Sequence, residues 1–272
     1  MTLGKGLPNL GNTCYINSIL QCLRYTKPFV FLLKNYDAKN ETPLMQSFID
    51  LLYAGATKQT LNSFVHRLAV SSPEFRLLRQ CDAHELYLYL VDTLYSKNFK
   101  FQNVFQGKMK STVECNVCGN QSITTTPFIS LSLQMVMNEV KSVSQLIDIF
   151  CAKEQLQAKI DCERCREKRE SVKTISIAEP PKVLVVHLKR FQGMLKISTR
   201  VKMNRVLLLS GRKYELYAVC NHSGGTGGGH YTAACRKRDG SWIMCNDDFI
   251  TEISSLPLES ESPYCLFYRI KD

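Results

Sequence analysis

One cysteine near the N-terminus is placed for nucleophilic chemistry. Residues 9–14 read Asn-Leu-Gly-Asn-Thr-Cys, and apolar residues then recur at helical spacing, at Ile16, Ile19, Leu20 and Leu23. We therefore expect Cys14 in the first turn of an amphipathic helix with Asn12 or Thr13 as its N-cap. The positive end of a helix and a nearby imidazole both favour a thiolate. The segment by itself leaves two interpretations open, a catalytic nucleophile and a buried structural thiol.

A thiolate nucleophile needs a histidine as its base, and the chain has five: His66, His84, His187, His222 and His230. His230 is the best candidate because it follows a glycine-rich run at 223–229, interpreted as a flexible loop, and begins a strand. His222, on the other side of the run, is the second candidate. We expect His187 in the core and His66 and His84 on helix surfaces.

A catalytic imidazole also needs an acceptor that orients its other nitrogen. The segment 242–248 reads as a strand that ends in Asn246 and Asp247. On a strand beside His230, one of these side chains would hold the imidazole and the other would support it. The alternative interpretation is an ordinary turn, which Asn and Asp begin very commonly.

Two C-x-x-C pairs predict a metal site. Cys115 and Cys118 form one pair, and Cys162 and Cys165 form the other. Two such knuckles supply the four thiolates of a tetrahedral Zn²⁺ site, which would be structural because no coordination position stays open. The alternatives are reduced thiols without a metal and a redox-active pair. The redox pair is disfavoured because neither pair opens a helix after a buried strand.

The elements around these residues predict an α+β fold. Helical spacing occurs at 44–53, 61–68 and 83–95, and again in a short segment at 140–151. Strand-like alternation of apolar and polar residues occurs at 107–114, 121–126, 128–135, 173–177, 182–188, 214–221, 230–237, 241–246 and 264–270. The chain therefore reads as a helical front half, a β insertion and a β-rich back half.

Composition narrows the class of protein. The 272 residues carry 35 Lys and Arg against 24 Asp and Glu, a formal net charge of +11. The cations are scattered, with mild clusters at 164–168 and 236–238, so we do not expect nucleic acid as a ligand. The N-terminus lacks an apolar stretch of signal-peptide length, and no apolar run is long enough for a membrane span. We expect an intracellular protein, cytoplasmic or nuclear, whose twelve cysteines are not a disulfide framework.

Five segments in order resemble the ubiquitin-specific protease family of deubiquitinases, which are papain-like cysteine proteases. The Cys box lies at 6–18 and a middle box at 80–86, and three further boxes lie at 181–191, 214–231 and 242–251. The resemblance implies a right hand of helical thumb, β palm and zinc-bearing β fingers. It places the thumb at about 1–100, most of the fingers at 101–180 and the palm at 181–272, as one minimal catalytic domain.

The resemblance also implies roles for residues that match the family motifs. Cys14 corresponds to the nucleophile, His230 to the general base, Asn246 to the third triad residue, and Asp247 to the adjacent assisting residue. Asn9 corresponds to the side-chain donor to the oxyanion. The implied substrate-binding residues are Asp82, Glu85, Gly229 and Tyr231, with the two carboxylates facing the basic C-terminal tail of ubiquitin.

The implied reaction is hydrolysis of the isopeptide bond after the Gly-Gly terminus of ubiquitin through a thioester, with ubiquitin and ubiquitinated proteins as partners of a monomer. Three alternatives stay open. The chain could bind ubiquitin without cleaving it, although every triad position holds a suitable residue. It could act on a ubiquitin-like modifier that also ends in Gly-Gly. A zinc-ribbon nucleic-acid protein is suggested only by charge and the two knuckles.

Overall fold

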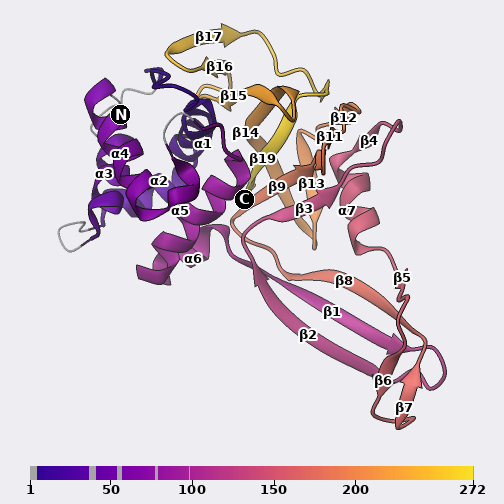
Figure 1. The fold of residues 1–272 in the computed structure, drawn as a ribbon. Helices are drawn as coiled ribbons and strands as arrows, with labels where there is room; N and C mark the ends of the chain where they lie inside the picture. The colour runs from indigo at the N-terminus through magenta and orange to yellow at the C-terminus, as the bar shows by residue number, and fades with distance from the viewer. Residues whose placement is uncertain (1–4, 37–40, 54–56, 77–78, 98, 272) are drawn as a thin grey trace.

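The structure is a computed structural model that describes residues 5–36, 41–53, 57–76, 79–97 and 99–271. Helices dominate the first part of the chain, where they form one lobe (Figure 1). They are α1 (Cys14–Arg24), α2 (Lys27–Lys34), α3 (Pro43–Tyr53), α4 (Lys58–Ser71), the 3₁₀ turn Pro73–Phe75, α5 (Ala83–Lys97) and α6 (Phe99–Phe105). No described helix is long and apolar enough to cross a bilayer.

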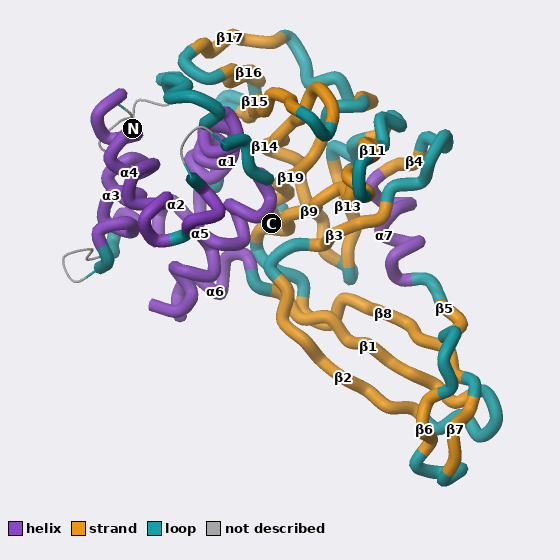
Figure 2. Tube along the Cα trace, viewed as in Figure 1, coloured by secondary structure: helices purple, strands orange, loops and turns teal. Residues whose placement is uncertain are grey.

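A four-stranded antiparallel sheet extends away from the body of the molecule (Figures 1 and 2). Its order is β2-β1-β8-β5, from β1 (Gly107–Cys115), β2 (Gln121–Phe128), β5 (Glu154–Gln155) and β8 (Ser171–Glu179). The short hairpin of β6 (Ile160–Cys162) and β7 (Glu167–Arg169) lies at its far end. This protruding sheet is the predicted β insertion.

An eight-stranded sheet, called the palm sheet below, is built mainly from the C-terminal half of the chain (Figure 2). Its order is β17-β16-β15-β14-β19-β9-β3, with β13 (Val206–Leu209) paired to β14. The other strands are β3 (Leu131–Gln134), β9 (Val183–Lys189), β14 (Arg212–Gly225), β15 (Gly228–Arg236), β16 (Trp242–Asn246), β17 (Phe249–Ile253) and β19 (Pro263–Ile270). Because β3 pairs in parallel with β9, a strand of the expected finger segment lies in the palm sheet.

Short elements cover the second face and edges of this sheet. They are α7 (Val143–Cys151), β4 (Lys141–Ser142), β10 (Phe191–Gln192), β11 (Leu195–Lys196), β12 (Val201–Lys202) and β18 (Glu259–Ser260). Alternate residues of β9 enter two separate cores: Val183 and Val185 face the helical lobe, whereas Leu184 and Val186 face α7. The sheet is therefore buried on both faces, as a run of consecutive apolar residues in a strand indicates.

Helix α1 differs from the expected amphipathic helix, because every residue from Cys14 to Leu23 is buried, polar ones included. The helix runs between the other helices and the palm sheet, so no face of it meets water. Thr13 occupies the N-cap position, one of the two expected, but its side chain makes no cap hydrogen bond. Its hydroxyl instead accepts a hydrogen bond from the Leu10 backbone N–H at 2.9 Å.

The glycine-rich run is mostly paired strand rather than the expected loop. Strands β14 and β15 form a hairpin in which Gly224 pairs with Gly229 and Gly225 with Gly228, so only two residues remain for the turn. Gly224 has φ +97°, which other residues adopt at a cost, and its close approach to Gly229 leaves no room for a side chain. Ladder hydrogen bonds between the two strands therefore order the segment that precedes His230.

Candidate active site

A tight loop delivers Cys14 to the start of α1. The Asn9 side-chain oxygen accepts hydrogen bonds from the backbone N–H groups of Gly11 (3.0 Å) and Thr13 (3.2 Å). Gly11 and Asn12 adopt left-handed conformations, with φ of 95° and 57°. The chain thus turns back on itself just before the helix and places the Cys14 side chain, 3% exposed, at the positive end of α1.

His230 and Asn246 meet across two neighbouring antiparallel strands, as the sequence predicts for this pair. His230 lies near the start of β15 and Asn246 ends β16, and its Oδ1 is 2.6 Å from His230 Nε2. An amide oxygen can only accept, so Nε2 carries the hydrogen and Nδ1 is left to take a proton. The imidazole is accessible, with 43% of its side chain exposed.

Asp247 connects the histidine strand to the cysteine loop. Its carboxylate accepts hydrogen bonds from the side-chain amides of Asn9 (2.9 Å) and Asn17 (2.8 Å), and one oxygen lies 3.9 Å from His230 Nε2. Its backbone C=O accepts from Leu7 N–H at 2.8 Å. Asp247 therefore fixes the position of the loop that presents Cys14 relative to the strand that presents His230.

Asn9 lies beside the site, and its side-chain amide already donates one hydrogen bond. An amide NH₂ carries two hydrogens, and the bond to Asp247 occupies one of them. The second hydrogen is available for an oxyanion donor of the kind the resemblance implies. Asn17, which sequence reasoning left out, anchors this arrangement from within α1 through its further bond to Leu7 C=O at 3.0 Å.

Gln80 is a second residue that sequence reasoning missed as part of the site. Its amide hydrogen-bonds both backbone groups of Gly229: Gly229 N–H donates to Oε1 at 2.9 Å, and Nε2 donates to the Gly229 C=O. The same Nε2 lies 3.7 Å from Cys14 Sγ. Gln80 therefore touches both the thiol and the residue before His230. Its place in the middle box was the only sequence signal for this role.

The expected substrate-binding residues differ in how much they can offer to a ligand. Asp82 accepts bonds from His84 N–H (2.6 Å) and Glu85 N–H (3.3 Å) at the start of α5, and from the Tyr264 hydroxyl. Its carboxylate is thus engaged in hydrogen bonds within the protein, and Asp82 is half-buried, whereas Glu85 is exposed. Tyr231 is only 4% exposed, so it would meet a ligand through its backbone rather than its ring.

His222 is buried and belongs to the hairpin itself, on β14 opposite Tyr231. A Cβ at Gly229 would lie 2.2 Å from His222 Nε2, so glycine is required for this contact. Burial, with a smaller effect of Lys196, lowers the pKa of His222 to about 4. A histidine that stays neutral and faces the inside of the hairpin does not suit the role of base, which leaves His230 as the candidate.

His84 is not on the helix surface as expected, because it is buried between α5 and β9 and stacks on His187, with ring centroids 3.9 Å apart. The Ser130 hydroxyl lies 2.9 Å from His84 Nε2, and the Ser132 hydroxyl lies 3.0 Å from His187 Nδ1. Burial lowers the pKa of His84 to about 4. Burial and the neighbouring His84 lower the pKa of His187 to about 2.

The four cysteines of the two C-x-x-C pairs come together at the far end of the protruding sheet. Their sulfur atoms all lie within 4.8 Å of one another, and those of Cys118 and Cys162 are 3.5 Å apart. Zn–S bonds of about 2.3 Å in a tetrahedron would separate the sulfurs by about 3.8 Å. Left-handed residues, Gly119 and Arg166, turn the chain after each pair. The group could hold a metal ion.

Comparison with known proteins identifies the family. The family model described as ubiquitin carboxyl-terminal hydrolase matches residues 5–268. The chain belongs to this family. Ubiquitin carboxyl-terminal hydrolase 23 of Arabidopsis thaliana is 30% identical over 98% of this chain and 35% of its own length. Human ubiquitin carboxyl-terminal hydrolase 21 is 27% identical over 97% of this chain and 61% of its own length.

Solved structures of deubiquitinase modules share the fold of this chain. The Ubp8/Sgf11/Sus1/Sgf73 module bound to ubiquitin aldehyde superposes with a TM-score of 0.89 at 25% identity, over 98% of this chain and 70% of that chain. The same module bound to monoubiquitin gives 0.88. The predicted family and α+β fold are therefore confirmed. The chain spans about a third to three fifths of the length of the curated relatives it matches.

Proposed function

We propose that the chain is a cysteine-type deubiquitinase that hydrolyses the isopeptide bond after the C-terminal Gly-Gly of ubiquitin. The observation that carries the proposal is the arrangement around Cys14: an imidazole oriented by Asn246, and a loop joined to that pair through Asp247. Membership of the ubiquitin carboxyl-terminal hydrolase family supplies the substrate class, and the neighbouring modules are solved with ubiquitin bound.

The residues support a thioester mechanism. Nδ1 of His230 takes the thiol proton, and the Cys14 sulfur attacks the carbonyl carbon of the terminal glycine. The developing oxyanion is stabilised by the Cys14 backbone N–H and the remaining Asn9 amide hydrogen. His230 then protonates the leaving lysine amine, and a water activated by the same imidazole hydrolyses the thioester. The Asn246 acceptor keeps the imidazole in the required tautomer throughout.

We infer that Cys115, Cys118, Cys162 and Cys165 bind one structural Zn²⁺. The support is the spacing of their sulfur atoms and the all-thiolate donor set, which suits zinc. The ion would hold together a hairpin of two three-residue strands that has little core of its own.

We further propose an intracellular location, which is supported by the free thiols of all twelve cysteines. We also propose that the enzyme acts as a monomer.

The test uses ubiquitin whose C-terminus carries a thiol-reactive electrophile, with wild type and Cys14→Ala side by side and intact-mass detection. We expect an adduct of one ubiquitin on wild type and none on Cys14→Ala. An adduct on both proteins would show that another thiol reacts and would overturn the assignment of Cys14. Tight ubiquitin binding without an adduct would favour a binding module, and reaction only with a probe built on another Gly-Gly modifier would change the substrate.

A further inference from the structure

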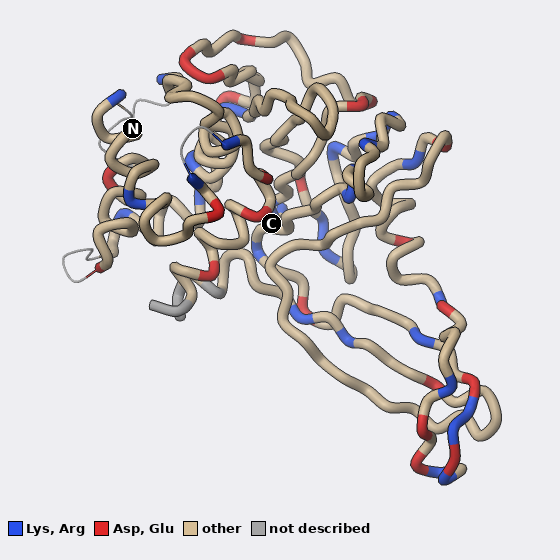
Figure 3. Tube along the Cα trace, viewed as in Figure 1, with Lys and Arg blue, Asp and Glu red and all other residues tan. Residues whose placement is uncertain are grey.

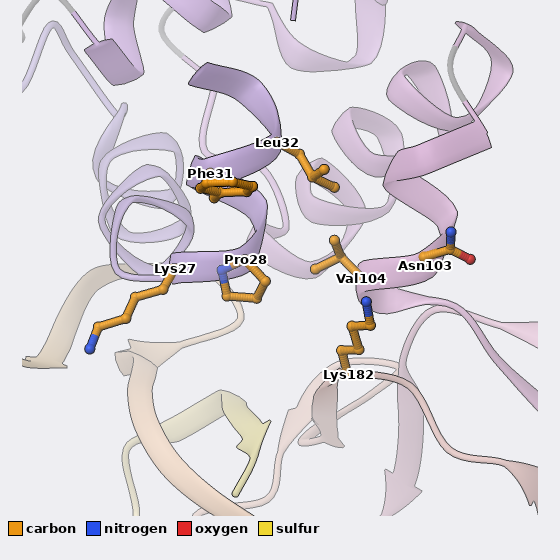
Figure 4. A pocket seen from close by; sticks show the side chains of 7 residues that line it. All are labelled: Lys27, Pro28, Phe31, Leu32, Asn103, Val104 and Lys182. Carbon is orange, nitrogen blue, oxygen red and sulfur yellow. The ribbon is translucent and has the colours of Figure 1, made fainter. Parts of the chain in front are cut away.

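A groove lies between α2 and α6 on the helical lobe (Figure 4). Its volume is about 470 Å³, within the range of about 300–1,000 Å³ typical of ligand pockets. Pro28, Phe31, Leu32 and Val104 form an apolar wall, and the groove is also lined by Lys27 and Lys182. Phe31 is 67% exposed, although Phe29 and Leu33 on the same helix are buried. An aromatic ring in this position is available to an incoming apolar side chain.

The groove is separate from the candidate active site. Cys14 begins α1, whereas the groove begins at Lys27, after α1 has ended at Arg24. Eleven residues of helix span about 16 Å at 1.5 Å per residue. An occupant of the groove would therefore leave the thiol and its histidine free.

Strand register places further cations at the end of the palm sheet next to the groove. Arg269 of β19 is paired with Glu215 of β14, and Ile270 N–H donates to the Lys182 C=O at 2.9 Å. Lys271 N–H donates to the Lys213 C=O at 2.8 Å. The start of α2 lies over the same strands, because the Thr26 hydroxyl is 2.6 Å from the Tyr217 hydroxyl. These contacts bring basic residues from four parts of the chain to one end of the palm sheet.

Much of this charge is not neutralised. Arg236 and Arg269 share Glu215, and Lys237 is paired with Asp239 and Glu252. The remaining cations make no ion pair with any carboxylate in the described part of the chain: Lys27, Lys182, Arg212, Lys213, Arg238 and Lys271. Burial and the neighbouring Arg269 and Arg238 lower the pKa of Lys27, which agrees with a crowd of positive charge at the groove.

The cluster of cations at 164–168 differs, because acidic residues lie among its basic ones. The β6–β7 hairpin carries Lys and Arg interleaved with Asp and Glu, as Figure 3 shows at the tip of the protruding sheet. Glu167, for example, is paired there with Arg169. At the end of the palm sheet beside the groove, by contrast, unpaired positive charge adjoins an exposed apolar surface.

We propose that this groove docks an acidic segment of a partner protein that carries apolar anchor residues. One anchor packs between Phe31, Leu32 and Val104, and carboxylates on either side meet Lys27 and Lys182. A nucleic-acid backbone would satisfy the cations but would present nothing aliphatic to the apolar wall of Pro28, Leu32 and Val104. The combined surface therefore favours an acidic, apolar peptide over a phosphate chain.

The test measures fluorescence anisotropy of a labelled synthetic peptide in which Leu and Phe lie four positions apart among glutamates, so that a helix would present them on one face. Two control peptides replace either the glutamates by glutamine or the Leu and Phe by alanine. A single-stranded DNA of equal charge is the fourth ligand. The protein variants are Phe31→Ser and the pair Lys27→Glu with Lys182→Glu.

Matched controls are Ile123→Ser, at a residue 55% exposed on β2, and Lys153→Glu, at an exposed lysine near β5. We expect saturable binding of the acidic, apolar peptide, weakened about 10-fold or more by Phe31→Ser and by the charge pair, as for an interface hot spot. The two matched control variants should bind the peptide as wild type does. Both control peptides should bind to wild type far more weakly. Salt should weaken wild-type binding and have less effect on the charge pair.

Wild-type affinity in Phe31→Ser, or equal binding of the peptide without Leu and Phe, would overturn the proposal, because the groove would then contribute nothing. Tighter binding of the DNA, insensitive to Phe31→Ser, would instead identify a nucleic-acid surface. Reaction of each variant with the ubiquitin probe at the wild-type rate would show that the variants are folded and that the groove is independent of Cys14.

Discussion

At the scale of single residues, the candidate active site depends on side chains that hold the reacting groups without reacting. Asp247 is bonded to Asn9 and Asn17 on one side and lies next to His230 on the other. Gln80 bridges the thiol and the backbone before the histidine. Small displacements of reacting groups are costly, since about 1 Å of misplacement can lower a rate about 100-fold.

Gln80→Leu should lower kcat about 10- to 100-fold with little change in KM or melting temperature, because it removes both hydrogen bonds to Gly229 at similar side-chain volume. Hydrolysis of a ubiquitin–fluorophore conjugate would measure both constants. Gln155→Leu, at an exposed position on strand β5 of the protruding sheet, is the matched control. An unchanged kcat in Gln80→Leu would show that Gln80 does not position the site.

Asn246→Ala should lower kcat at least about 10-fold but less than Cys14→Ala does, because a misoriented imidazole still accepts a proton part of the time. Asn246→Asp keeps an acceptor for His230 Nε2 and should restore most of the lost rate. The same conjugate assay distinguishes the three variants. If alanine and aspartate were equally inactive, a role other than accepting the Nε2 hydrogen would be required.

At the scale of elements, two hairpins carry the candidate sites: the β14–β15 hairpin holds His230, and the β6–β7 hairpin lies at the four-cysteine cluster. Lys196 of β11 donates to the His222 C=O (3.0 Å) and the Gly224 C=O (2.8 Å), which ties the first hairpin to its neighbour. The second hairpin has few apolar contacts, since most of its residues are exposed. The two hairpins therefore respond to different changes.

Gly229→Ala should impair the hairpin, because the new methyl group would meet His222 and the Ser223 C=O at 2.2 and 2.5 Å. We expect loss of ubiquitin-probe reactivity and destabilisation of about 1–3 kcal/mol, as for overpacked sites. Gly227→Ala is the matched control, because nothing lies within 4 Å of its added methyl group. Chemical denaturation would measure the stability of both variants, and labelling with the ubiquitin probe would measure their reactivity. Equal behaviour of the two would contradict the packing argument.

Removing the metal should loosen the protruding sheet before the rest of the protein. We expect about one zinc per chain by elemental analysis and none retained by Cys162→Ser, which lacks one of the four thiolates. Hydrogen exchange should then increase in β6, β7 and the adjoining ends of β1 and β8, and stay unchanged in α1. Cys151→Ser is the control thiol outside the cluster. Full zinc in Cys162→Ser would exclude this ligand set.

At the scale of the whole molecule, two lobes meet over the stacked histidines. His84 comes from α5 of the helical lobe and His187 from β9 of the palm sheet, and Tyr264 of β19 packs edge-on against the second ring. Asp82, bonded to Tyr264, is the acidic group that faces His84. Protonation of either imidazole would place a charge in this interface, so the contact between lobes requires neutral rings.

The free energy of unfolding should fall as pH drops from about 6.5 to about 4. Burial holds the pKa of His84 near 4 in the folded protein, so below 6.5 the unfolded chain binds a proton that the folded one does not. The loss from His84 is on the order of 3 kcal/mol. Denaturation across this range should show a weaker pH dependence in His84→Gln than in wild type. His66→Gln, at an exposed histidine, should match wild type. Identical slopes in all three would contradict the argument.

The sequence by itself determined most of the elements and the candidate reacting residues. Hydrophobic periodicity locates α3, α4, α5 and most strands, because each repeat reports which side of a local element is buried. Residue chemistry selected His230 and left Asn246 and Asp247 as alternatives for its partner. Motif order indicated the family, and the resemblance chose Asn246, whose Oδ1 lies 2.6 Å from His230 Nε2 in the structure. These features were accessible because they depend on neighbours in the chain or on spacing that a motif preserves.

Only the tertiary structure decided which distant residues meet. The stacking of His84 on His187 and the hydrogen bonds of Gln80 to Gly229 each join residues more than a hundred positions apart. The burial of α1 on every side likewise depends on elements outside the helix. The glycine run looked like a loop because glycine has low strand propensity, yet its pairing across the hairpin and its contact with His222 require it. Local patterns report burial and turns, whereas a partner across the fold leaves no periodic trace in the sequence.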